Sequence, residues 1–172
     1  MKIGIIGLSD FDNGHPFSFS AIINGYNEKE FRKTNFRNIL DYLKKKPKKA
    51  FGFKGVKITH AWTQNKKLTK MLSNSCLIDN EVKNYKEMIG LIDGLIIARD
   101  DLHFKISKIF LERNIPVFID KPLTSNLNEL KFFKKYLDNG LLMSTSGLRY
   151  SNEIIYIKKK IKTLGKIRVV NG

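Results

Sequence analysis

Short apolar runs recur along the chain, and segments with helical periodicity separate them. A continuous apolar run such as LIDGLIIA predicts a strand buried on both faces of a parallel sheet, because a half-exposed strand would alternate apolar with polar residues. Since helical segments alternate with the strands, the pattern predicts a doubly wound, mainly parallel α/β sheet. Strands are predicted at residues 2–7, 56–63, 81–84, 91–98, 116–120 and 141–144.

Helices are predicted where apolar residues recur every three or four positions. Residues 18–26 form one such segment, with Ser18 as its N-cap. Another starts at a capping-box-like Asn126-x-x-Glu129 and stops at Gly140. The apolar stripe of this second helix consists of Leu127, Leu130, Phe133 and Leu137. Further helices or helical turns are predicted at residues 36–46, 68–76, 85–89, 103–114 and 152–164.

Residues 27–55 fit the alternation least well, because the helix at 36–46 is followed by Pro47 and a basic loop up to Gly55. We interpret this segment as an insertion in a single domain of residues 1–148. Residues 149–172 are expected to begin a second, α+β domain, with the helix at 152–164 and a strand at 166–170.

Composition narrows the class of protein. The chain has 172 residues and a net charge of +16, carried mainly by lysine. Its densest basic run, residues 44–49, is typical of a solvated helix end. The charge is the only feature that favours a nucleic-acid partner, and we do not expect one. No apolar run approaches the ~20 residues of a membrane span, and no signal-peptide layout is present. With a single cysteine, Cys76, no internal disulfide can form, and we expect a cytoplasmic protein without a metal site.

Ligands of doubly wound sheets bind beyond the carboxyl ends of the strands, so the residues that follow each predicted strand are the candidates for a site. A dinucleotide-binding loop has the form G-x-G-x-x-G, and here only Gly7 fits, because Ser9 and Asp12 occupy the other glycine positions. The second strand is followed by Lys66 and Lys67 instead of a carboxylate that would bind the adenosine ribose. These lysines either accept a 2′-phosphate or form a solvated turn, so NAD and NADP both remain open.

Four motifs, in order, carry a resemblance to a known family: KIGIIG at residue 2, ARDDLH at 98, IDKPLT at 119 and GLRYSNEI at 147. They resemble the Gfo/Idh/MocA oxidoreductases, with Asp120 in place of the glutamate of a Glu-Lys-Pro motif. The resemblance covers nearly the whole chain except residues 27–55. The loop NGHPFSFSAIINGY is also similar to that of a subgroup associated with bacterial surface-sugar metabolism.

The resemblance implies a Rossmann-type domain and NAD(P)-dependent hydride transfer at a sugar, sugar-nucleotide or cyclitol carbon. Lys121 is implied as the catalytic residue near the reacting hydroxyl, with Asp120 and Pro122 fixing its position. The residues implied to bind or surround the cofactor are Gly7, Ser9, Asp10, Phe11, Asn65, Ala98, Arg99, His103, Asp120, Pro122 and Arg149. Within this set, the Ala98–Arg99 backbone would pass under the adenosine ribose, and His103 would line the nicotinamide pocket. Arg149 would hold cofactor or substrate.

Simpler interpretations exist for these residues. Lys121-Pro122 can be a plain turn, His103 can be a helix-start residue, and Arg149 can pair with Glu153 on the surface. His15, in the loop after the first strand, is a further candidate for contact with a phosphate or substrate.

The family's second domain, with most of the substrate pocket and usually a catalytic histidine, is not represented, so we expect little or no turnover from this chain alone. An alternative function is a non-catalytic nucleotide-binding or assembly module, which would form a homo-oligomer through its C-terminal segment. The apolar residues that would form such a contact are Ile154, Ile155, Ile157, Ile161, Val169 and Val170.

Overall fold

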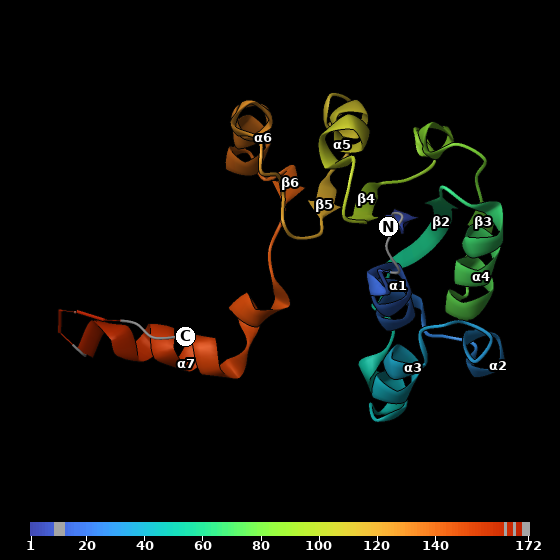
Figure 1. Ribbon diagram of the computed structural model, residues 1–172, viewed down its shortest axis with the longest axis horizontal. Helices are drawn as coiled ribbons and strands as arrows, with labels where there is room; N and C mark the ends of the chain where they lie inside the picture. The colour runs from blue at the N-terminus through green and yellow to red at the C-terminus, as the bar shows by residue number, and fades with distance from the viewer. Residues whose placement is uncertain (9–12, 164, 167, 170–172) are drawn as a thin grey trace.

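A six-stranded parallel sheet with the strand order β3-β2-β1-β4-β5-β6 forms the centre of the computed structural model (Figure 1). The structure describes residues 1–8, 13–163, 165–166 and 168–169. The strands are β1 (Lys2–Gly7), β2 (Lys57–Thr63), β3 (Asn80–Glu81), β4 (Gly94–Ala98), β5 (Val117–Ile119) and β6 (Leu142–Met143). This order confirms the predicted doubly wound, Rossmann-type sheet.

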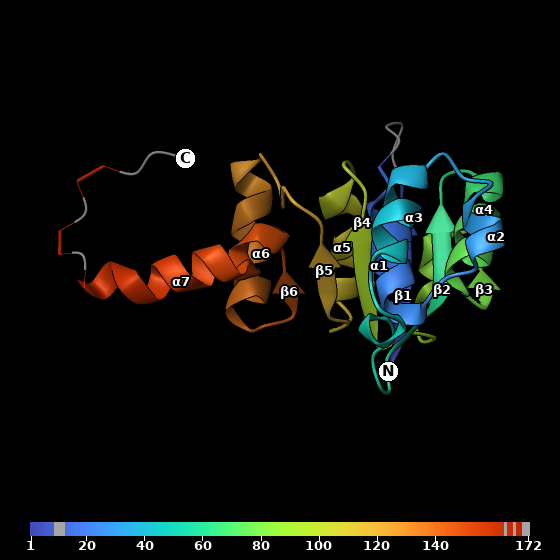
Figure 2. The same cartoon turned by 90° about the horizontal axis from the view of Figure 1, so that it is seen from below.

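Helices cover the sheet from both sides, and each side has its own apolar core. Ile5 of β1 packs with Phe17 and Leu72 on one face, whereas Ile97 of β4 packs with Phe110 and Phe133 on the other. The first face carries α1 (His15–Asn24), α2 (Glu28–Phe31), α3 (Arg37–Lys44) and α4 (Lys66–Cys76), and the second carries α5 (His103–Leu111) and α6 (Leu127–Asp138). Figure 2 shows α1 and α3 in front of the sheet at β1.

Short 3-10 helices and one further α-helix complete the chain. They are η1 (Lys48–Ala50), η2 (Tyr85–Met88), η3 (Gly147–Tyr150), α7 (Asn152–Lys160) and η4 (Ile161–Thr163). The chain moves outward from β1 to β3, returns through η2, and then moves from β4 to β6 in the opposite direction. This reversal separates the loops that follow β1 and β4, where such sheets leave a crevice for ligands.

The segment 27–55 packs into the first core as part of the same body. Its side chains Phe31, Phe36, Leu40 and Leu43 are buried against α1 and the sheet. At the N-terminal end of α1, a Cβ added to Gly14 would lie 2.4 Å from Ile39 Cδ1. The segment therefore packs tightly against the start of α1, directly after the loop that follows β1.

The structure differs from the predicted helices in the start of α1 and in the presence of α2. The first helix begins at His15, with Gly14 as N-cap and Pro16 in its first turn, and not at Ser18. Proline is favoured in the first helical turn because the N–H it lacks would have no partner there. Helix α2, four residues long with Asn27 as its N-cap, has no counterpart in the prediction because it is too short to show periodicity.

In α6 the predicted apolar stripe is also wrong. Only Phe133 of that stripe is buried, together with Tyr136, and Leu127, Leu130 and Leu137 are exposed. The side chain of Asn126 caps the helix as expected by accepting from the N–H groups of Asn128 and Glu129.

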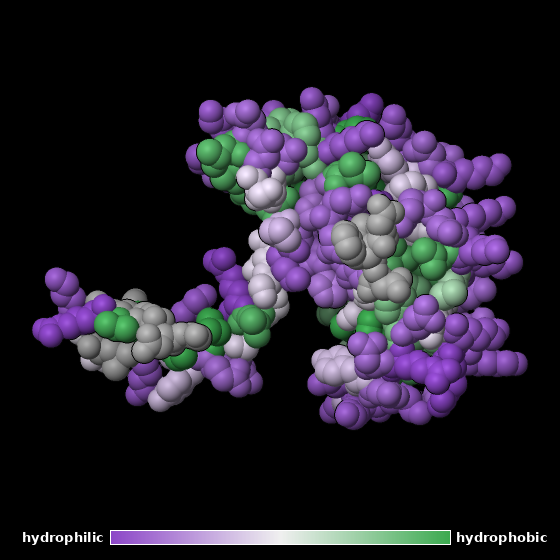
Figure 3. All heavy atoms as spheres, in the orientation of Figure 1, coloured by the Kyte–Doolittle hydropathy of each residue, from purple (hydrophilic) through white to green (hydrophobic). Residues whose placement is uncertain are grey.

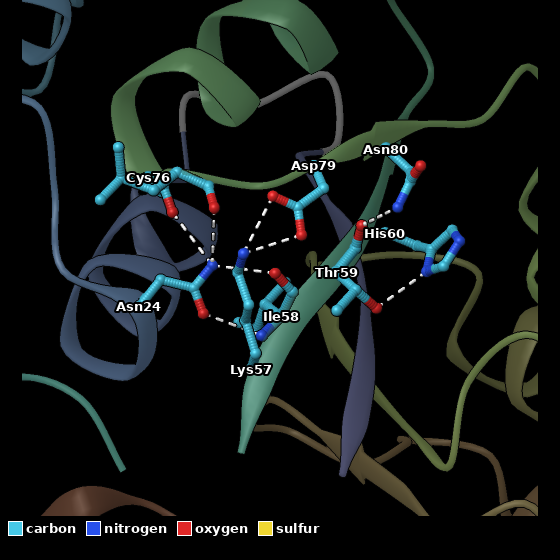
Figure 4. A network of polar contacts seen from close by, with 9 residues as sticks. Asn24, Lys57, Ile58, Thr59, His60, Cys76, Asp79 and Asn80 are labelled. Atoms are coloured by element: carbon cyan, nitrogen blue, oxygen red, sulfur yellow. Dashed lines mark hydrogen bonds and ion pairs between the residues drawn. The ribbon is translucent and has the colours of Figure 1, made fainter. Parts of the chain in front are cut away.

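The edge of the sheet opposite the reversal crevice is held by one amide side chain (Figure 4). Asn24, at the end of α1, donates from Nδ2 to the carbonyls of Ile58 (2.8 Å) and Cys76 (3.1 Å), and its Oδ1 accepts from the Ile58 N–H (2.8 Å). Lys57 forms an ion pair with Asp79 nearby. Asn24 therefore joins α1, β2 and α4, which fixes the orientation of α1 relative to the strands.

The segment after β6 differs from the rest of the molecule. No described residue of α7 is buried, and Figures 1 and 3 show the segment as an arm beside the sheet. The expected strand at 166–170 is absent from its described residues, which are 166, 168 and 169. Within the described ranges, no helix is long and apolar enough to cross a membrane.

Candidate active site

The three central strands bring the main candidate residues to one edge. Gly7 and Ala98 are register partners at the carboxyl ends of β1 and β4, and Asp120 follows β5 directly. A Cβ on Gly7 would lie 2.3 Å from Pro16 Cγ, so only glycine allows the first turn of α1 to approach β1 this closely. Leu8, the next residue, is buried with φ +59°, a left-handed conformation that is rare for a branched side chain.

Ser9, Asp10 and Phe11, the other residues predicted in this loop, lie outside the described residues, as does Asp12. The described part of the loop resumes at Asn13, whose Oδ1 accepts from the His15 N–H (2.9 Å) and whose Nδ2 donates to Asp100 (3.0 Å). The loop after β1 and the loop after β4 are thus joined by a direct hydrogen bond.

Arg99 directs a buried guanidinium toward the first half of the sheet. Its side chain is 3% exposed, Nε donates to Asp101 Oδ1, and the guanidinium carbon lies 5.7 Å from the centroid of the Trp62 ring in β2. Its Nη1 is buried and has no hydrogen-bond partner among the described residues. A buried donor without an acceptor is costly, so this nitrogen is suited to an acceptor that a ligand would provide.

Asp120 is the buried acid of the site, with a side chain only 5% exposed. Its Oδ1 accepts from the Lys121 N–H (2.9 Å), its own N–H donates to the Ile97 carbonyl (2.9 Å), and its Oδ2 pairs with Nδ1 of His15. These contacts connect β4, β5 and the first residue of α1. Asp120 therefore holds both Lys121 and His15 in place.

Lys121 lies at the rim of a cleft of about 500 Å³. The floor is apolar and includes Phe118 of β5 and Met143 of β6, and α1 contributes His15 and Phe19 to one wall. The segment after β6 forms the opposite wall, with Thr145, Ser146, Gly147, Leu148 and Tyr150. No hydrogen bond or ion pair of the Lys121 ammonium is present within the described residues, so its charge is available to a ligand in the cleft.

The remaining predicted residues lie elsewhere along this edge. His103 is buried, with Nδ1 3.1 Å from the Leu123 carbonyl and Nε2 against the Arg99 carbonyl, so its ring ties two loops together. It lines, with Pro122, a second cleft of about 350 Å³. Asn65 is the N-cap of α4, because its Oδ1 accepts from the N–H groups of Lys67 and Leu68.

Arg149 is exposed in η3, and no ion pair with Glu153 is present in the described part of the chain. The direct involvement of His103, Asn65 and Arg149 in cofactor binding stays a prediction.

Two features of this site were missing from the sequence-based prediction: the pairing of His15 with Asp120 and the contact of Arg99 with Trp62. The first joins residues 105 positions apart. In the sequence, the only indication of this pairing was the presence of His15 in the loop after the first predicted strand. Nothing in the sequence pattern near Trp62 indicates its contact with Arg99.

Other reactive groups do not add a second centre. Burial raises the pKa of the Cys76 thiol, which donates to the Phe17 carbonyl (3.5 Å). Such a thiol is a small core group, since the thiolate is the reactive form. No group of three or more His, Cys, Asp or Glu residues suited to a metal ion occurs among the residues that the structure describes.

Comparisons with known proteins agree with this geometry. The model of an oxidoreductase family with an NAD-binding Rossmann fold matches residues 1–140. No curated protein sequence matches the chain significantly. Among solved structures, myo-inositol 2-dehydrogenase from Lactobacillus plantarum superposes with a TM-score of 0.66 at 20% identity, covering 97% of this chain and 43% of that one.

Two further structures show the same fold. Scyllo-inositol dehydrogenase from Lactobacillus casei, solved with bound NAD(H) and scyllo-inositol, has a TM-score of 0.62 at 15% identity and covers 95% of this chain. UDP-N-acetylglucosamine 3-dehydrogenase from Acidithiobacillus ferrooxidans has a TM-score of 0.61 at 14% identity and covers 92% of it. The chain spans between 41% and 43% of the length of these three proteins.

Proposed function

Because the chain belongs to the Gfo/Idh/MocA oxidoreductase family, which has an NAD-binding Rossmann fold, we propose that it is the dinucleotide-binding part of a dehydrogenase. The substrate is a hydroxyl, or the corresponding carbonyl, of a sugar, sugar nucleotide or cyclitol. The observation that carries this proposal is the convergence of Gly7, Arg99 and Lys121 at the carboxyl ends of the adjacent strands β1, β4 and β5. By their names, the structural neighbours described above are dehydrogenases of inositols and of UDP-N-acetylglucosamine, which supports this substrate class.

The residues present fit a nicotinamide dinucleotide. Gly7 lets the first turn of α1 lie against the carboxyl end of β1, and the unpartnered Nη1 of Arg99 is a buried donor at the same edge. We assign Arg99 to the adenosine end, because its guanidinium reaches toward β2, the strand after which the ribose lies in such folds. The loop after β2 has no carboxylate, and Lys66 begins the helix α4 that follows it, so NADP is a cofactor to test beside NAD.

Lys121 is assigned to the reacting end. The bound nicotinamide would supply the acceptor or donor of a hydride, and the protein would supply position and charge. In the cleft, the Lys121 ammonium attracts the substrate oxygen and stabilises negative charge that develops on it. The backbone hydrogen bond from Lys121 to the buried Asp120 fixes the start of this side chain.

Binding of the dinucleotide is the direct test. Trp62 is the single tryptophan and lies beside Arg99, so its fluorescence reports a reduced nicotinamide dinucleotide bound at this edge. We expect saturable quenching on titration with NADH or NADPH, and the ratio of the two dissociation constants gives the cofactor preference. The absence of any signal with both at millimolar concentration would remove the proposal for this chain.

Replacing Lys121 with Ala separates binding from chemistry. We expect the dissociation constant for NADH to change less than about threefold, because Lys121 lines the cleft at the proposed reacting end and lies away from the adenosine end assigned to Arg99. In a full-length relative, the same replacement of the matching lysine should abolish turnover, as measured by NADH formation. The exposed Lys131 of α6 is the control, and K131A should change neither quantity. Turnover that survives the replacement would refute the assigned role.

An assembly role is a second candidate, favoured by the exposed apolar residues of the segment after β6. Ile154, Ile155, Tyr156 and Ile157 are each more than a third exposed on α7. Exposed apolar groups of this density mark contact surfaces in many proteins. In this reading the chain forms a homo-oligomer through that segment, and a monomer by light scattering at all concentrations would count against it.

A further inference from the structure

We propose that a pocket at the C-terminal end of α1 binds a nucleoside diphosphate, with the base against two aromatic rings and the phosphates beside three lysines. The pocket has a volume of about 480 Å³, and its lining includes Tyr26, Glu28, Lys44, Lys46, Lys48 and Phe51. The inference is independent of the proposed function, because it concerns a different place in the molecule.

The pocket and the Lys121 cleft lie at opposite ends of α1. The helix begins at His15, which lines the cleft, and it ends two residues before Tyr26, which lines the pocket. A helix of 10 residues spans about 15 Å, and no described residue lines both sites. α1, α2 and α3 lie side by side around the pocket (Figure 1). It is therefore a second candidate site with its own chemistry.

Two aromatic rings form the apolar wall of the pocket. The ring centroids of Tyr26 and Phe51 lie 5.4 Å apart, and the two rings are inclined at 76°. Tyr26 is supported from behind by the fully buried Phe31, whose ring centroid lies 6.1 Å away. Both Tyr26 and Phe51 are only partly buried, so each ring leaves surface for a ligand. A nucleobase can stack on one of these rings and place its edge against the other.

The charge of the pocket favours an anion. Glu28 is the one acidic residue in the described lining, and it is already paired with Arg32 and with Lys44, whose Nζ lies 3.2 Å from Glu28 Oε1. Its negative charge is therefore compensated within the protein, and the same contact holds Lys44 in place.

The other two lysines keep their charge available. Lys46 Nζ lies 4.8 Å from the centroid of the Tyr42 ring, which orients the ammonium without neutralising it. No hydrogen bond or ion pair of the Lys48 ammonium is present within the described residues. Lysine ammonium groups bind phosphate as point charges, and several of them around one pocket favour a ligand with more than one negative charge.

The turn after α3 places an ammonium group next to a ring. Lys48 is the first residue of η1, and its carbonyl accepts from the Phe51 N–H (3.2 Å). Side chains three residues apart in a 3-10 helix lie above one another, so Lys48 and Phe51 project to the same side. The Gly52 N–H donates to the Ile22 carbonyl (2.9 Å), which joins this turn to α1. Adjacent groups for a phosphate and for a flat ring match the composition of a nucleotide.

The size of the pocket limits the ligand to a small molecule. Pockets for small ligands have volumes of about 300–1,000 Å³, and this one lies within that range. Its two rings meet at an angle and do not form a row, so they accommodate one base and not the successive bases of a strand. A single nucleoside diphosphate therefore fits better than a nucleic acid.

The test is a titration of the isotope-labelled 172-residue chain with UDP, followed residue by residue through the amide signals in NMR spectra. UDP has no adenosine, so it does not address the adenosine end assigned to Arg99. We expect saturable shifts for Gly25, Phe51 and Gly52, with a dissociation constant below about 1 mM, and no shift for Gly7. Uridine, which lacks phosphates, and inorganic pyrophosphate, which lacks a base, should each bind at least about tenfold more weakly.

A matched pair of variants separates the pocket from the general positive charge of the chain. Lys48→Glu should weaken UDP binding at least about tenfold, because it places a carboxylate beside the phosphates. The control is Lys54→Glu, which makes the same change of charge at an exposed position outside the pocket and should weaken binding less than about twofold. The spectra of both variants also show whether the fold is retained.

Four outcomes would overturn the inference. They are shifts at Gly7 in place of Gly25, pyrophosphate binding as tight as that of UDP, equal weakening by K48E and K54E, and tighter binding of oligothymidylate than of UDP per nucleotide. The first two need no variant, so they remain decisive if K48E fails to fold. The Trp62 titration with NADH tests the proposed function separately from all four.

Discussion

The two halves of the sheet are covered differently on the face that carries α1. Over β1 and β2, the side chains Ile5 and Ile58 are completely buried under α1, α4 and the segment 27–55. Over β5 and β6, Phe118 is only partly buried and Met143 is 45% exposed, although they are neighbours in the same sheet. The covered half is closely packed against α1, and the open half provides the floor of the cleft.

The comparison explains where the chemistry can take place. Phe118 and Met143 line the Lys121 cleft because α1 covers them only in part, through the contact of Phe19 with Phe118. On this face, α1 links the two halves: the ring centroids of Phe19 and Phe118 lie 5.9 Å apart, and His15 pairs with Asp120. A tightly held α1 therefore positions one wall of an otherwise open site.

The largest difference between the halves should appear when one phenylalanine is removed from each. Phe17→Ala leaves a cavity beside Phe31 and Phe36 and is expected to destabilise the fold by about 4 kcal/mol. Phe118→Ala should cost only about 1 kcal/mol, because part of its surface is already in water. Urea unfolding measures both, and equal costs would show that the open half is packed as tightly as the covered one.

A glycine pair sharpens the same contrast at smaller magnitude. Gly7→Ala places a methyl group against Pro16 and should destabilise by about 2 kcal/mol, since either α1 or β1 must shift. The matched control is Gly147→Ala in the cleft wall, where a Cβ meets nothing within 4 Å and the cost should stay below about 0.5 kcal/mol. Thermal unfolding of the two variants distinguishes them. A harmless G7A would mean that the close approach of α1 to β1 is not required.

Arg99 follows β4, and its guanidinium reaches Trp62 in β2. Because its Nη1 has no partner among the described residues, replacing Arg99 should affect dinucleotide binding more than folding. Arg99→Met keeps the length of the side chain but loses the buried donors, and we expect about tenfold weaker NADH binding. The control is Arg113→Met, because Arg113 bonds the Ile109 carbonyl at the exposed end of α5. Trp62 fluorescence follows both titrations. Unchanged affinity in R99M would show that Nη1 serves no ligand.

Much of the fold could be predicted from the sequence, because the strands that form it are short apolar runs with clear ends. All six strands were predicted to within a few residues, and the parallel order follows from their alternation with helices. The face of α6 that is buried could not be predicted. Helical periodicity alone does not distinguish a buried face with Leu127, Leu130 and Leu137 from one with Phe133 and Tyr136. The position of the sheet determines that the second of these faces is buried.

The candidate site was predictable in its position and less so in its contacts. The carboxyl ends of β1, β4 and β5 place Gly7, Arg99 and Lys121 together in any sheet with this order. The partner of Asp120 depends on where α1 begins, and that in turn on Pro16, which the prediction of Ser18 as N-cap missed. A shift of three residues in that helix start changes which side chain of α1 faces β5.

The smallest expected effect is a pH dependence that belongs to the covered half alone. Burial, and then the nearby charge of Lys2, lower the pKa of His60, whereas Asp79 opposes them. The unfolded chain, with an ordinary histidine pKa near 6.5, therefore binds a proton more readily than the folded chain. Stability contributed by neutral His60 is complete above this value and is lost as the pH falls toward the folded pKa. Urea midpoints at pH 7.5 and 5.5 (about these values) should thus differ more in the wild type than in His60→Asn. An equal difference in both proteins would show that the acid sensitivity does not come from His60.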